Sequence, residues 1–108
     1  EGIALSLDER KRLIRDLGPH KAMILRNHGL LVGGGSVAKA FHEIHFLERA
    51  CQAQIQALAG GSELVFPSEE VCVHTSRQFD GDEADSIIDM SWRAVLTLIE
   101  DQRASYCS

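Results

Sequence analysis

The sequence predicts a layered α/β fold, and three features carry that prediction. Two short segments, residues 22–27 and 30–33, are apolar at nearly every position and are separated by a polar turn, which is typical of strands covered on both faces. A sheet buried on both faces needs helices on each side. The third feature is the periodic apolar pattern of residues 37–59, which predicts a long helix able to cover such a sheet.

A short helix is expected before the strands. Ser6 and Glu9 have the spacing of a capping box, in which a hydroxyl and a carboxylate satisfy each other's exposed backbone N–H groups. Apolar residues follow at helical spacing, and Gly18-Pro19 supplies the left-handed residue and the breaker that end a helix. This helix is amphipathic, so it needs a partner surface to be stable.

The long helix over residues 37–59 is the main packing element that the sequence predicts. Gly60-Gly61 ends it. Cys51 lies within its apolar stripe, which predicts a buried structural thiol and not a nucleophile. The stripe consists of eight residues at helical spacing: Val37, Ala40, Phe41, Ile44, Leu47, Cys51, Ile55 and Leu58.

Two further helices are predicted in the second half of the chain. A strand-like piece, residues 63–66, precedes a helix that begins at Pro67-Ser68 and runs to about Phe79. Asp82 is expected to cap a last helix over residues 83–101.

Composition narrows the functional classes. The chain has 108 residues, which is one domain or a piece of one, and it begins with Glu1, which predicts an origin inside a longer reading frame or trimming. The net charge of −5 argues against nucleic acid as the main partner, because phosphate contacts need a concentrated basic face. No apolar run approaches a membrane span. Cys51, Cys72 and Cys107 form no CxxC pair, so we expect neither a disulfide framework nor a zinc knuckle, and we expect a reducing, cytoplasmic location.

The strongest functional signal is the turn Arg26-Asn27-His28-Gly29 between the two strands. An imidazole beside an amide and a glycine, on a turn held by a rigid scaffold, is a candidate ligand or acid–base group. A zinc site needs three or four ligands, and this chain offers one convincing candidate. No nucleophile lies in a recognisable elbow. Residue chemistry alone therefore predicts that His28 is one member of a site whose other members lie outside this chain.

Other motifs have weaker functional interpretations. His42 and His45 are spaced one residue too close for the HExxH zinc motif, which favours histidines at a core edge or an interface. Gly33-Gly34-Gly35 precedes a helix, but neither glycine-rich phosphate-binding pattern is present, so a flexible turn is the better interpretation. His20 and His74 have no partner in sequence and are interpreted as surface groups.

Residues 25–41, LRNHGLLVGGGSVAKAF, closely resemble the RNHGL…VG…V…AF signature of the class II aldolase/adducin family. Glu1-Gly2-Ile3 is similar to the EGI segment of that family, and residues 47–54, LERACQAQ, are similar to its LxxACxxQ helix. Trp92 and the Ser105-Tyr106 tail also resemble the end of bacterial members. The resemblance implies that residues 1–108 are the C-terminal portion of a single domain of this family.

The resemblance implies a three-layer α/β/α fold with a mostly antiparallel central sheet. It also implies a metal-dependent lyase that cleaves a small sugar phosphate or a related hydroxy-carbonyl compound, in which a divalent ion, expected to be zinc, stabilises an enediolate. His28 matches the metal ligand of the NHG turn, and Arg26, Asn27 and Gly29 support that turn. The other metal ligands would be a His-x-His pair upstream of residue 1. An acidic residue for proton transfer would also come from upstream. Alone, the chain is expected to bind metal weakly and to have no aldolase turnover.

The resemblance has implications for partners as well. Active sites of the family lie between subunits, so a homo-oligomer, expected to be a tetramer, and a small-molecule substrate are implied. Tyr106 matches, by position only, a catalytic tyrosine supplied by a neighbouring subunit; otherwise the polar tail, residues 101–108, is expected to be frayed. The alternative is a non-catalytic, adducin-like binding or scaffold domain of the cytoskeletal type, which shares the fold and motif and lacks the metal pair. Gly18-Pro19 before the first strand, Arg26 and the LxxACxxQ helix favour that adducin-like branch.

Overall fold

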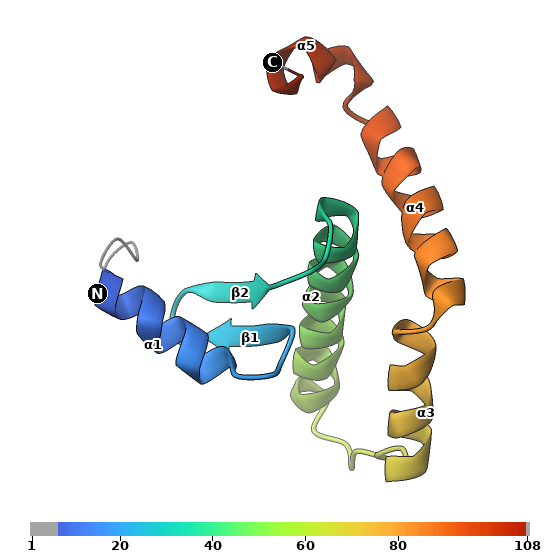
Figure 1. Ribbon diagram of the computed structural model, residues 1–108. Helices are drawn as coiled ribbons and strands as arrows, with labels where there is room; N and C mark the ends of the chain where they lie inside the picture. Colours follow the sequence, from blue (N-terminus) through green and yellow to red (C-terminus); the bar gives the residue numbers. More distant parts are fainter. Residues whose placement is uncertain (1–6, 108) are drawn as a thin grey trace.

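The computed structural model describes residues 7–107, apart from the side chains of Asp82 and Glu83, as a series of helices and one β-hairpin (Figure 1). Helix α2 lies between the hairpin and α4 and contacts both of them. The elements in chain order are α1 Leu7–Leu17, β1 Ala22–Leu25, β2 Gly29–Val32, α2 Val37–Ala59, α3 Glu69–Phe79, α4 Asp82–Thr97, the 3-10 turn η1 Glu100–Gln102 and α5 Arg103–Tyr106.

Helix α1 ends where the sequence predicts. Gly18 adopts the left-handed conformation, with φ of 55°, and its N–H donates to the carbonyl of Ile14 at 3.1 Å. This is the usual way in which a glycine closes the last turn of a helix. The predicted capping box at Ser6 and the Glu1-Gly2-Ile3 segment lie outside the described residues.

Helix α2 has the predicted bounds. The hydroxyl of Ser36 accepts a hydrogen bond from the backbone N–H of Lys39 at 3.2 Å, which caps the first turn. The helix ends at Ala59, and Gly61 follows with φ of 66°. Cys51 is a free thiol and is half-buried, so it is less buried than predicted.

The hairpin is antiparallel, as expected, and its strands are shorter than predicted. β1 and β2 have four residues each, in a register that pairs Leu25 with Gly29. The prediction that both faces are covered is wrong for the described residues, because Ile24 is 67% exposed and none of the strand side chains is buried. Three layers are likewise not seen within residues 7–107, where α2 covers β2 and no further strand pairs with the hairpin.

The connection before α3 differs from the prediction. Residues 63–66 are not a strand, because no described segment pairs with them, and Val65 is 95% exposed. The following helix is as predicted: the hydroxyl of Ser68 accepts from the N–H of Val71 at 3.4 Å, and α3 ends at Phe79.

The last predicted helix is shorter and starts earlier than expected. Gly81 is the N-cap, so Asp82 is the first residue of α4 and does not cap it. α4 ends at Thr97, whose hydroxyl donates to the carbonyl of Ala94 at 2.6 Å, a side-chain bond that competes with the helical pattern. The tail then forms η1 and α5, so residues 101–106 are helical, whereas a frayed tail was expected.

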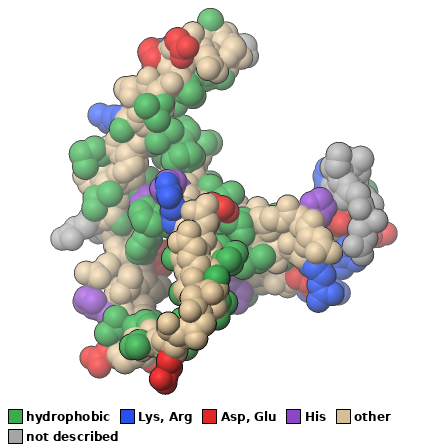
Figure 2. Space-filling view, turned by 180° about the vertical axis from the view of Figure 1, so that it is seen from behind, with side chains coloured by type: hydrophobic (Ala, Val, Ile, Leu, Met, Phe, Trp, Pro, Cys, Tyr) green, Lys and Arg blue, Asp and Glu red, His purple; other side chains and the backbone are tan. Residues whose placement is uncertain are grey.

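The molecule is elongated and its core is small. Its radius of gyration is 17.1 Å, whereas a compact chain of this length has about 13 Å. Its accessible surface, 9377 Å², is about half as large again as the roughly 6,000 Å² expected for a folded monomer of this mass. Among the described side chains only Ile88 is buried, and Figure 2 shows hydrophobic side chains exposed along the arm that α4 forms. None of the helices in residues 7–107 has the length and apolar character that a bilayer crossing requires.

Candidate functional site

The candidate site is the tip of the β1–β2 hairpin. Because Leu25 pairs with Gly29, the connecting loop consists of residues 26–28. The backbone N–H of His28 donates to the carbonyl of Leu25 at 3.2 Å, which closes a β-turn around Arg26 and Asn27. The turn therefore fixes the backbone at His28.

Two residues of the turn have backbone conformations that explain their identity. Asn27 has φ of 58°, and asparagine tolerates this left-handed region better than other residues with a Cβ atom. Gly29 has φ of 137°, which residues with a side chain rarely adopt. A Cβ atom at Gly29 would meet nothing within 4 Å, so glycine is needed there for its backbone and not for space. Residues 26–28 thus form a turn, and its role in supporting a metal ligand stays a prediction.

The turn presents its polar side chains to the surface. Arg26, Asn27 and His28 are all exposed. Within the described residues no group of three or more His, Cys, Asp or Glu side chains is arranged to hold a metal ion. A catalytic zinc uses three protein ligands, so these residues do not form such a site by themselves. A role of His28 as one ligand of a metal site stays a prediction.

A groove lies between the start of β2 and the middle of α2, next to the turn. Its floor and rim come from Gly29 and Leu30 on the hairpin and from six residues of α2. The amide of Gln52 donates to the carboxylate of Glu48 at 3.3 Å within the groove. The α2 residues are Phe41, Ile44, His45, Glu48, Arg49 and Gln52.

The polar side of this groove was not predicted from the sequence as part of a site. Glu48 and Arg49 lie three and four residues after His45, and Gln52 lies four and three residues after them, so all four share one face of α2. This polar stripe beside the apolar stripe of α2 is the sequence pattern from which these groove residues could have been predicted. Its position beside the His28 turn depends on the packing of α2 on β2, which periodicity does not reveal.

Two ion pairs hold the site's supporting elements together. Lys21, just before β1, pairs with Asp80 at the end of α3, and this hydrogen bond raises the pKa of Lys21 above its ordinary value. Lys39, in the first turn of α2, contacts both carboxylate oxygens of Asp85 in α4, at 2.8 and 3.1 Å. These contacts connect the hairpin and α2 to the α3–α4 arm.

The histidines of α2 lie in an aromatic cluster. The ring of His42 is 4.7 Å from that of Phe46 and 5.6 Å from that of Phe79 in α3. His45 lies 5.6 Å from Phe46, and Phe41 packs against Trp92 of α4 at 5.4 Å. These contacts agree with histidines at a core edge, and within the described residues His42 and His45 belong to no cluster of metal ligands.

The glycine-rich connection before α2 has a packing role. A Cβ atom at Gly34 would lie 2.8 Å from the backbone nitrogen of Ala40, which is closer than such contacts allow. A Cβ atom at Gly35, by contrast, would have no atom within 4 Å. Close passage of the chain over the first turn of α2 thus explains Gly34 without a phosphate ligand.

Tyr106 lies far from the hairpin. It belongs to α5, at the far end of α4, and is 43% exposed (Figure 1). Its side chain therefore does not join His28 within one chain. A catalytic role for Tyr106 stays a prediction that requires a second subunit.

Comparisons with known proteins agree with the motif in the hairpin. The family model described as Class II Aldolase and Adducin N-terminal domain matches residues 3–55. A protein of Caulobacter vibrioides with the provisional name aldolase class 2 protein is 37% identical over 106 residues, which cover 98% of this chain and 41% of that protein. Human gamma-adducin is 46% identical over 54 residues, which cover 49% of this chain and 8% of that protein.

A solved structure extends the similarity to three dimensions. The crystal structure of an aldolase II superfamily protein from Pseudomonas syringae is 45% identical and superposes with a TM-score of 0.70, covering 98% of this chain and 41% of that one. The chain thus spans about two fifths of the length of these bacterial relatives. The motif, the family model and the shared fold together show that this chain belongs to the class II aldolase and adducin family.

Proposed function

We propose that this chain forms part of a metal-dependent aldolase-type lyase that acts on a small sugar phosphate or a related hydroxy-carbonyl compound. The observation that carries the proposal is the hairpin tip, where a turn with two residues of positive φ fixes the backbone on both sides of His28. The extent of similarity supports the enzymatic branch, because the bacterial aldolase class 2 relative matches 98% of the chain and gamma-adducin matches 49%.

In this proposal each residue of the turn has a defined role. His28 donates one imidazole ligand to a divalent ion, expected to be zinc, and the other ligands come from outside the described residues. Asn27 and Gly29 hold the turn in its conformation of positive φ, so that the backbone at His28 does not have to be ordered when the ion binds. When bound, the ion supplies Lewis-acid stabilisation of negative charge on substrate oxygens.

The proposal extends to the rest of the domain. The complete domain has three α/β/α layers around a mostly antiparallel sheet, with residues 1–108 as its C-terminal portion. The outer edges of β1 and β2 support this, because neither edge has a partner strand within the described residues and such edges are usually paired or covered. We further propose a cytoplasmic homotetramer, in which a neighbouring subunit supplies Tyr106 to the site.

An aldol-cleavage assay tests the proposal. The protein expressed from its complete reading frame is incubated with short phosphorylated and unphosphorylated hydroxy-ketoses, and aldehyde release is measured with and without a chelator. We expect cleavage that the chelator abolishes and that zinc or manganese restores. His28→Ala should lower the rate by on the order of 100-fold or more, because loss of a direct ligand costs at least as much as loss of its supporting partners.

A matched histidine provides the control. His20 is exposed and lies outside the turn, so His20→Ala should leave the rate within a factor of about 2. Equal loss in the two variants, or activity that survives the chelator, would contradict the proposal. The sequence upstream of Glu1 gives an independent check, since the proposal requires a His-x-His pair there.

The second candidate is a non-catalytic, adducin-like binding or scaffold domain. It is favoured by the higher identity to gamma-adducin, 46%, within the matched 54 residues. This candidate predicts no His-x-His pair upstream, no bound metal in the purified protein and no cleavage of any hydroxy-carbonyl compound. The same assay and metal analysis therefore separate the two functions.

A further inference from the structure

The β-hairpin is weakly anchored by its own side chains. None of its strand residues is buried, and within residues 7–107 β1 pairs with β2 alone. A two-stranded hairpin is marginally stable in water, so it depends on attachment to other elements. One attachment is the packing of β2 on α2. A second attachment lies at the base of the hairpin, the end opposite the turn at His28.

Lys21 and Gly33 form the base of the hairpin. The backbone carbonyl of Lys21, just before β1, accepts from the N–H of Gly33, just after β2, at 2.7 Å. The ammonium group of Lys21 donates to the carboxylate of Asp80, which lies 59 residues later and is the C-cap of α3. Lys21 therefore both closes the hairpin and links it to the α3–α4 arm.

A second lysine makes a similar link beyond β2. Lys39 lies in the first turn of α2, and a Cβ atom at Gly34 would be 3.2 Å from its carbonyl carbon, so Lys39 is close to the point where the chain leaves the hairpin. Its ammonium group contacts both carboxylate oxygens of Asp85, 46 residues later, at 2.8 and 3.1 Å. Both lysines therefore bind one short segment, residues 80–85, where α3 meets α4. We define the charge clamp as these two ion pairs: Lys21 with Asp80, and Lys39 with Asp85.

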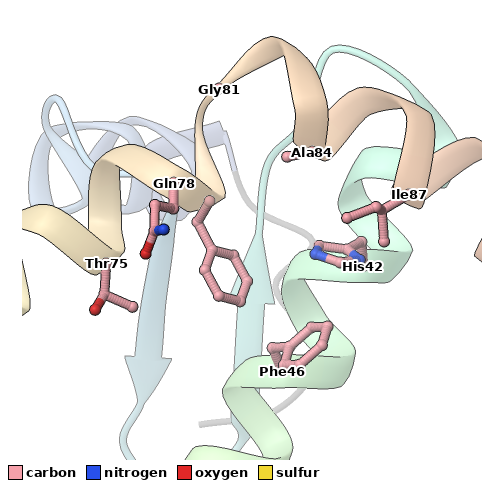
Figure 3. Close-up of a pocket in the computed structure, with 8 residues that line it drawn as sticks. His42, Phe46, Thr75, Gln78, Gly81, Ala84 and Ile87 are labelled. Atoms are coloured by element: carbon pink, nitrogen blue, oxygen red, sulfur yellow. The ribbon is translucent and has the colours of Figure 1, made fainter.

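Apolar packing fixes this junction only in part. An open groove separates part of the junction from α2 (Figure 3). Ala84 and Ile87 line its α4 side, and His42 and Phe46 line its α2 side. Apolar contacts are non-directional, so the aromatic contacts beside the groove tolerate small rotations. Hydrogen-bonded ion pairs are directional, so the clamp supplies contacts that define an orientation.

The charges of the clamp act together. The hydrogen bond to Asp80 is the main cause that raises the pKa of Lys21, and the charge of Glu43 on α2 adds to it. Lys21 thus faces acidic groups from two different helices. The side chains of both ion pairs are about half exposed, so each pair alone contributes little and is screened by salt. Several charges arranged together contribute more than an isolated pair.

We propose that the charge clamp fixes the orientation of the hairpin and that its four residues are positioning residues for the turn at His28. The importance of the turn as part of a metal site rests on the proposed function, whereas the hold on the hairpin does not. The four residues of β1 span about 14 Å, so a rotation of about 10° at the base moves the turn by roughly 2 Å. A working site has to be held to within about 0.5 Å.

Amide exchange tests the hold on the hairpin. In the protein expressed from its complete reading frame, peptides that cover residues 21–33 are followed by mass spectrometry. Combined Asp80→Asn and Asp85→Asn should speed exchange there by roughly 3- to 10-fold, the range that two exposed ion pairs allow. Asp8→Asn is the matched control, because it breaks a pair with Lys11 that lies within α1 and should leave this exchange unchanged.

Charge reversal separates the ion pair from a general loss of stability. Lys21→Asp places two carboxylates side by side and should speed exchange of residues 21–33. Adding Asp80→Lys restores opposite charges and should return exchange to within about 2-fold of the wild type. Unchanged exchange in the combined Asn variant, or no restoration by the second reversal, would overturn the proposal.

Zinc affinity tests the positioning of the turn. Measured by competition with a chelator, the combined Asn variant should bind zinc roughly 10-fold more weakly, an effect comparable to the loss of a partner that supports a ligand. Asp8→Asn should bind like the wild type. Faster exchange with wild-type zinc affinity would overturn the positioning role of the clamp. Zinc binding by none of these proteins would contradict the proposed function, and the exchange result would then decide on the clamp by itself.

Discussion

Replacement of Gly29 by alanine tests how the hairpin holds the candidate site. Gly29 has φ of 137°, and a Cβ atom there would meet no atom within 4 Å. The substitution therefore adds backbone strain without a steric clash, and strain of this kind costs roughly 1–3 kcal/mol. Gly35 also has open space around a Cβ atom and has no positive φ, so Gly35→Ala is the matched control.

Urea unfolding followed by circular dichroism measures the difference. Gly29→Ala should lower the free energy of unfolding by about 1–3 kcal/mol relative to the wild type. Gly35→Ala should leave it unchanged or raise it by about 0.4–1 kcal/mol, because alanine restricts the unfolded chain. Equal stabilities of the two variants would refute the claim that the backbone of the turn requires glycine at position 29.

Three further predictions concern the surrounding structure. Gly34→Ala should destabilise the protein by about 1–3 kcal/mol in the same urea assay, because its Cβ would lie 2.8 Å from a backbone nitrogen of α2; stability equal to that of the wild type would contradict the packing role. Ser68→Ala should cost about 1 kcal/mol and reduce helicity in α3, measured by amide exchange, since it removes the cap on Val71; unchanged exchange in the first turn would refute it. Asp80 raises the pKa of Lys21 above 10.5 in the folded state, so the ion pair stabilises the fold below about pH 10 and this contribution disappears as pH rises through the raised pKa. The stability gap between the wild type and Asp80→Asn should accordingly narrow in alkaline solution, and a gap that widens there would contradict the assignment.

Local signals predicted the helix bounds well because the responsible interactions are local. The hydroxyl of Ser36 accepts from the backbone N–H of Lys39, three residues later, and caps α2. The backbone N–H of Gly18 donates to the carbonyl of Ile14, four residues earlier, and closes α1. Such contacts need no tertiary partner, so sequence alone reveals them. The end of α4 was mispredicted: the helix ends at Thr97, four residues before position 101, and the chain continues as a 3-10 turn.

Burial was harder to predict because it depends on what surrounds each segment. An apolar run such as residues 63–66 has the composition of a strand, but a strand also needs a neighbour to pair with. Ile24 and Phe66 remain exposed in the described structure for the same reason. The same difference applies to the candidate site. The turn at His28 depends on local residues and was predictable from the sequence. The groove that Glu48 and Arg49 line beside it depends on the packing of α2 on β2 and was not.

We propose that His28 is one ligand of a metal site whose other ligands lie outside the described residues. Calorimetric titration of the 108-residue chain with zinc tests it most directly, with His28→Ala and His20→Ala as the two variants. We predict binding weaker than about 1 µM for the wild type and for His20→Ala, and weaker binding still for His28→Ala. Sub-micromolar affinity of the wild-type chain, or an affinity that His28→Ala leaves unchanged, would contradict the claim.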